Sequence, residues 1–67
     1  MEQEIRQVIN EVFYDLEAAC NDCGETLCAE GLADSVGDQM YDRNEEYRAM
    51  PYEQRRALTL KISKLYV

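Results

Sequence analysis

Four carboxylate side chains recur every four residues in the middle of this sequence. They are Glu30, Asp34, Asp38 and Asp42. Residues four apart lie on one face of an α-helix, about 6 Å apart along its axis, so on a helix these carboxylates form a row. Between Arg6 and Arg43 the sequence has no lysine or arginine to pair with them. The row predicts a surface that binds basic side chains, and an ordinary solvated helix face is the alternative.

Acidic residues are also frequent nearer to the start of the chain, where Glu11 and Asp15 are four residues apart. Residues 1–42 contain eleven acidic residues and one basic residue, a net charge of −10. Residues 43–67 have a net charge of +3, which gives −7 for the whole chain. This charge opposes direct binding to nucleic acid and favours a basic protein surface as the partner.

Three cysteines, Cys20, Cys23 and Cys28, form a C-x2-C-x4-C pattern. A structural zinc site needs four ligands, and the chain has no histidine. The fourth ligand would have to come from Asp22, Glu25 or a partner chain, and an iron–sulfur cluster has the same shortfall. We therefore expect no metal and no other cofactor, and a cysteine-based metal or redox switch stays open as an alternative function.

The lack of histidine also removes the commonest general base, and the sequence shows no catalytic motif. We therefore expect the protein not to be an enzyme. No apolar run is long enough for a membrane span or a signal peptide, which favours a cytoplasmic location.

Glu11 and Asp15 belong to an amphipathic helix that is predicted over about residues 2–21. Its apolar residues follow an i, i+3, i+4, i+7 pattern without a break. They are Ile5, Val8, Ile9, Val12, Phe13, Leu16, Ala19 and Cys20. The pattern predicts that Phe13 lies at the centre of the core and that Tyr14 faces solvent. Gly24 is suited to the left-handed conformation that ends a helix.

The carboxylate row is predicted to lie on a second helix, over about residues 27–43. Thr26 is a suitable N-cap for this helix. Its apolar face carries Leu32, Val36 and Met40, opposite the carboxylates.

A third helix is predicted over about residues 51–66, because Pro51 suits the first helical position. Its apolar side consists of Leu58, Ile62, Leu65 and Tyr66. Residues 43–50 are predicted to form a connector with a turn of helix around residues 45–48. The chain is therefore predicted to be all-α, a single helical domain over residues 1–67 folded as a compact three-helix bundle.

Five tyrosines provide a second kind of contact surface, because tyrosine offers a large apolar area with a polar tip. An alternative function is therefore a helical interaction or assembly subunit that binds through tyrosines and through residues 51–66. Leu60, which falls opposite the apolar side of that helix, would then belong to a self-association patch. A homodimer stays open on this reading.

In size, charge and helical make-up, the chain resembles small proteins encoded by phages and mobile elements. Some of these inhibit a partner by imitating nucleic acid, among them certain anti-restriction and anti-CRISPR proteins. The resemblance is one of composition, covers no motif and assigns no residue roles. It implies an inhibitor that presents carboxylate rows to the basic groove of a nucleic-acid-binding protein. The residues predicted to bind the partner are Glu11, Asp15, Glu30, Asp34, Asp38, Asp42, Tyr14 and Tyr41.

Overall fold

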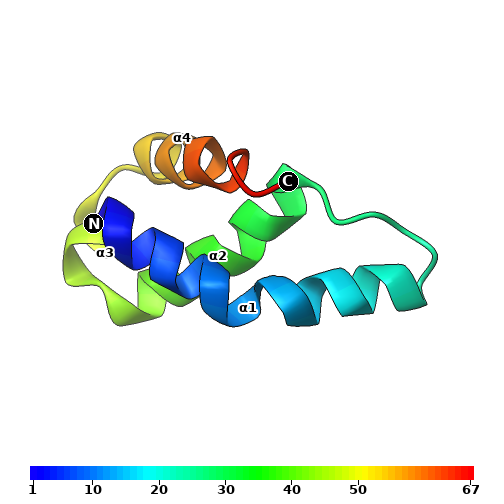
Figure 1. The fold of residues 1–67 in the computed structure, drawn as a ribbon. Coiled ribbons are helices and arrows are strands. Elements are labelled where there is room, and N and C mark those ends of the chain that lie inside the picture. The colour runs from blue at the N-terminus through cyan, green and yellow to red at the C-terminus, as the bar shows by residue number, and fades with distance from the viewer.

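The computed structural model describes residues 1–67 as four α-helices without a strand (Figure 1). The helices are α1 (Glu2–Asp22), α2 (Ala29–Arg43), α3 (Glu45–Ala49) and α4 (Tyr52–Ser63). Helix α2 packs against α1, α3 and α4, and α1 also packs against α4. The prediction of an all-α helical bundle is confirmed, and the short helix α3 occupies the predicted connector.

The turn after α1 is a Schellman motif built on glycine. Gly24 has a φ of 78°, in the left-handed region that side chains other than glycine rarely adopt. Its N–H donates to Asn21 O at 3.0 Å, and the Glu25 N–H donates to Cys20 O at 2.8 Å. The predicted helix-ending role of Gly24 is therefore confirmed.

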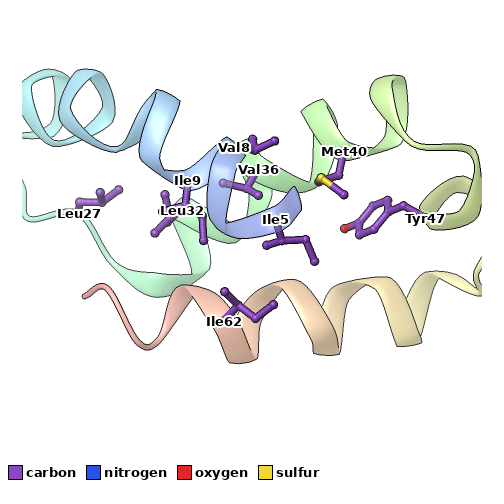
Figure 2. Close-up of a cluster of buried hydrophobic side chains, with 9 residues drawn as sticks. All are labelled: Ile5, Val8, Ile9, Leu27, Leu32, Val36, Met40, Tyr47 and Ile62. Carbon is purple, nitrogen blue, oxygen red and sulfur yellow. The ribbon is translucent and has the colours of Figure 1, made fainter. Parts of the chain in front are cut away.

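The start of α2 corrects the prediction, because this helix begins at Ala29 rather than at residue 27. Its N-cap is Cys28, whose Sγ accepts a hydrogen bond from Gly31 N at 3.4 Å, and not Thr26. Leu27 explains the shift, because its side chain is buried in the core from the non-helical segment before α2 (Figure 2).

The core is a cluster of nine buried side chains drawn from every element (Figure 2). They are Ile5, Val8 and Ile9 of α1, Leu27 of the segment before α2, Leu32, Val36 and Met40 of α2, Tyr47 of α3 and Ile62 of α4. The predicted apolar face of α2 is therefore confirmed. The core residues of α1 all belong to its N-terminal half.

The second half of the α1 stripe differs from the prediction. Phe13 is half-buried at the margin of the core rather than at its centre, and Ala19 is exposed. The reason is helix length, because the 21 residues of α1 extend about 32 Å, whereas α2 and α4 extend about 22 and 18 Å. The last turns of α1 therefore run past the first turn of α2 (Figure 1).

The C-terminal end of the last helix also differs from the prediction, because α4 ends at Ser63 rather than at residue 66. The N–H groups of Leu65 and Tyr66 donate to carbonyls three residues back, each at 3.0 Å, and so form turns instead of continuing the helix. Leu65, predicted for the core, is consequently 67% exposed. At the other end, Pro51 is the N-cap of α4 and its first helical residue is Tyr52.

Tyr47, like Leu27, is a core residue that the sequence pattern did not predict. The side chain of Asn44 caps α3 by accepting from Tyr47 N at 2.8 Å, which fixes the direction in which this buried side chain enters the core. Thr59 Oγ1 donates its proton to Arg55 O at 2.8 Å. The Tyr47 hydroxyl, 2.6 Å from Thr59 Oγ1, is therefore the donor in the bond that joins α3 to α4.

A stability prediction follows from Ser63, which is fully buried while its Oγ has no hydrogen-bond partner. We expect Ser63→Ala to raise the free energy of unfolding by about 1 kcal/mol, because it removes a desolvated hydroxyl that bonds to nothing. Urea titration followed by circular dichroism measures the change. Thr59→Val is the control, because it removes a bonded hydroxyl and should lower stability. A destabilised Ser63→Ala variant would mean that the hydroxyl is bonded in solution.

Candidate partner-binding surface

The α2 carboxylate row lies on the solvent side of its helix. Glu30, Asp34, Asp38 and Asp42 are all exposed. The residues on the opposite face, Leu32, Val36 and Met40, are completely buried. The spacing in the sequence therefore correctly placed these four side chains together on one accessible face.

Part of this row borders a groove between α2 and α4, with a volume of about 270 Å³. Asp34, Asp38 and Tyr41 line it from α2, and Tyr52, Arg55 and Arg56 line it from α4. Its remaining lining residues are Ala33, Gly37, Tyr47 and Thr59. A Cβ at position 37 would lie 3.3 Å from the Tyr47 hydroxyl oxygen, so glycine allows this oxygen to approach α2 closely.

The charges in this groove are partly compensated within the chain. Arg56 donates a hydrogen bond to Asp34 and forms an ion pair that joins α4 to α2. Asp38, one turn further along α2, has no cation within ion-pair distance. Asp38 is therefore the groove carboxylate that is free to pair with a partner's cation.

The aromatic wall of the groove is held by arginines. The Arg55 guanidinium lies over the rings of Tyr41 and Tyr52, at 5.1 and 5.6 Å from their centroids, and donates to Met50 O at 2.5 Å. Arg48 lies 5.5 Å from the Tyr41 centroid and donates to the carbonyls of Tyr41 and Asp42 at 2.9 and 3.2 Å. These cations therefore bond carbonyls at the C-terminal ends of α2 and α3, where the helix dipole favours positive charge.

Glu11, predicted to bind the partner, is engaged inside the protein. Arg43 donates two hydrogen bonds to its carboxylate, at 3.0 and 3.1 Å, and so links α1 to the last turn of α2. These hydrogen bonds lower the pKa of Glu11, and they raise that of Arg43. Glu11 is therefore a less available contact than the free carboxylates of α2.

This pairing predicts a pH effect. The pKa of Glu11 is lower in the folded chain than its ordinary value of 4.5. The ion pair therefore adds stability at pH values above 4.5, and this stability is lost as the pH falls through the lowered folded-state pKa. We expect Arg43→Gln to return the Glu11 pKa upward, which a carboxyl-carbon NMR titration measures. Arg6→Gln is the control, because Arg6 pairs with Glu2 instead and its loss should leave the Glu11 pKa low. An unchanged Glu11 pKa in Arg43→Gln would contradict the ion pair.

The remaining predicted residues on α1 stand apart from the groove. Asp15 and Tyr14 are exposed, and the Tyr14 side chain is 78% accessible, as its place off the apolar stripe predicts. The structure thus brings Asp34, Asp38 and Tyr41 together but leaves Tyr14 and Asp15 outside their groove. The sequence analysis missed the α4 side of the groove, although the charge contrast between residues 1–42 and 43–67 was a signal for it.

The three cysteines are free thiols, with Cys20 half-buried and Cys23 and Cys28 exposed. The structure has no group of three cysteine, aspartate or glutamate side chains arranged to hold a metal ion. None of the helices combines the length and apolar character needed to cross a membrane. Comparison with protein-family models, with curated proteins and with solved structures finds no match for this chain.

Proposed function

We propose that this protein is a non-enzymatic binding module that presents carboxylates to a basic surface of a nucleic-acid-binding protein. The observation that carries the proposal is that every arginine already bonds an acceptor within the chain. Arg6, Arg43 and Arg56 pair with carboxylates, and Arg48 and Arg55 bond backbone carbonyls.

This internal pairing decides which charges a partner meets. The chain has fourteen carboxylates, and three of them form ion pairs, so eleven are left without a cation. The cations without an internal acceptor are two lysines, Lys61 and Lys64. An excess of unpaired charge of one sign attracts a partner of the opposite sign and accelerates encounter.

The arrangement of these charges supports imitation of nucleic acid. Glu30, Asp38 and Asp42 are unpaired members of one row on a helix that packs against three others. Their separations, one or two helical turns, are of the same order as the spacing of phosphates along a strand. A groove of lysines and arginines that normally holds phosphates would therefore bind this row, and its occupation would inhibit the partner, which is how certain anti-restriction and anti-CRISPR proteins act.

The α2–α4 groove supplies a place for one partner side chain. A lysine or arginine that pairs with Asp38 would lay its aliphatic stem beside Tyr41 and Tyr52, which are 45% and 67% exposed although Arg55 lies over both rings. The aromatic contact adds apolar area to the ion pair, so we expect this side chain to contribute more than a simple surface salt bridge.

The experiment is capture of partners on the immobilised protein from lysate of the cells that naturally express it. We expect the captured proteins to be nucleic-acid-binding proteins that are released by added duplex DNA or RNA. Raising salt from about 50 mM to about 300 mM should also release them, because exposed charge pairs are screened. Partners that remain bound with excess nucleic acid and at high salt would overturn the proposal and favour a tyrosine-centred contact.

A further inference from the structure

Two of the three cysteines belong to the final turn of α1. The N–H of Cys23, the C-cap, donates to Cys20 O at 3.1 Å and to Ala19 O at 3.3 Å. The shorter of these bonds joins residues three apart, which is the 3₁₀ pattern, and in a 3₁₀ turn such side chains lie one above the other. Cys20 and Cys23 therefore share one side of the end of α1.

The spacing of this pair suits a disulfide bond. Residues three apart on a helix have Cα atoms about 5 Å apart, and disulfides join Cα atoms about 4.4–6.8 Å apart. The Cβ atoms must approach from about 5–6 Å in a regular helix to about 4 Å. The position of Cys23 permits this adjustment, because the helix ends there and Gly24, with a φ of 78°, turns the chain away.

The third cysteine, Cys28, is held at a different place. Its Sγ accepts a hydrogen bond from Gly31 N at 3.4 Å and so caps α2. Leu27 beside it is buried in the core, and the end of α1 and the start of α2 are well separated in Figure 1. A bond between Cys28 and Cys23 would therefore break the cap of α2 and draw Leu27 out of the core.

The two thiols of the pair differ in access, which sets the order in which they react. Cys23 is exposed, and Cys20 is half-buried against the core. We propose that Cys20 and Cys23 form a redox modification site, at which a small-molecule disulfide such as oxidised glutathione converts the two thiols into a disulfide. The site lies outside α2, so it goes beyond the proposed function and does not depend on it.

The oxidation consists of two exchange steps. The Cys23 thiol loses its proton to water, and its sulfur attacks one sulfur of oxidised glutathione and releases one glutathione thiolate. The Cys20 sulfur, also deprotonated, then attacks Cys23 Sγ and releases the second glutathione thiolate. Two electrons pass from the protein sulfurs to the glutathione disulfide, and the two released thiolates take up the two protons. Because Cys23 is exposed, an excess of reduced thiol reverses both steps.

The test compares two variants of the whole chain, each of which keeps Cys23 and one other cysteine. Cys28→Ser keeps the pair on α1 and replaces the cap of α2 by serine, which is also a good N-cap. Cys20→Ser keeps Cys23 and Cys28 instead. Each variant is incubated with oxidised glutathione, its fold is checked by circular dichroism, and the intact mass and the linked peptides are measured by mass spectrometry.

We expect Cys28→Ser to become about 2 Da lighter without a bound glutathione, and dithiothreitol to restore its mass. Cys20→Ser should keep bound glutathione and form at least about tenfold less internal disulfide, because its two thiols are held apart. In the parent chain, the linked peptides should join Cys20 to Cys23. Equal internal disulfide in the two variants, glutathione retained on Cys23 in Cys28→Ser, or a parent linkage that includes Cys28 would each overturn the proposal.

Discussion

Ile9→Ala is expected to lower the free energy of unfolding by about 2–5 kcal/mol. Ile9 is fully buried in the core cluster, together with Ile5 one turn before it. Truncation removes buried apolar surface and leaves a cavity that the surrounding helices fill only in part. A domain of 67 residues has a total stability of about 3–10 kcal/mol, so the variant should be largely unfolded in mild urea.

Phe13→Ala is the matched control for this prediction, because it removes a larger side chain from the same helix. Phe13 is half-buried, so its loss should cost only about 1–2 kcal/mol. Urea titrations followed by circular dichroism compare the two variants directly. A Phe13→Ala variant less stable than Ile9→Ala would mean that the core is centred on the second half of α1.

These two residues show what the apolar pattern can predict. The pattern correctly identifies the α1 helix and the face that turns inward, because that face follows from helical periodicity alone. It does not reveal how much of the face is covered, since the coverage depends on the lengths of α2 and α4. The C-terminal half of the stripe is as regular as the first half, yet Leu16 and Cys20 are only partly buried.

Tyr47 marks a second limit of the sequence analysis. Nothing in the hydrophobic pattern distinguishes it from the exposed Tyr41, six residues earlier. The available signal was local, because Asn44 followed by two glutamates is typical of a helix N-terminus. That signal predicts α3, but the burial of Tyr47 also depends on Thr59, Gly37 and the rest of the groove floor.

The ion pairs were likewise beyond the sequence pattern and change how the carboxylates are tested. Asp34 and Glu11 look equivalent to their neighbours in the sequence, but each bonds an arginine from another part of the chain. Substitution of Asp34 would free Arg56 and loosen the contact between α2 and α4. A binding test should therefore use only unpaired members of the row.

The variant that meets this condition combines Glu30→Gln, Asp38→Asn and Asp42→Asn. We expect it to bind the captured partner more than about tenfold more weakly than the parent, because several charge-assisted contacts are lost together. Its affinity should also depend less on salt, since fewer charges are screened. The fold should be kept, and removal of the repulsion between Asp38 and Asp42 slightly favours α2.

The control is a variant with the same change in total charge elsewhere on the surface: Glu45→Gln, Glu46→Gln and Glu53→Gln. All three residues are exposed and none of them is in an ion pair. If net charge alone attracted the partner, both triple variants would lose affinity equally. If the α2 row forms the contact, the control should stay within about threefold of the parent at every salt concentration, whereas the row variant loses binding most strongly at low salt. Equal binding by the row variant and the parent would refute nucleic-acid imitation by α2.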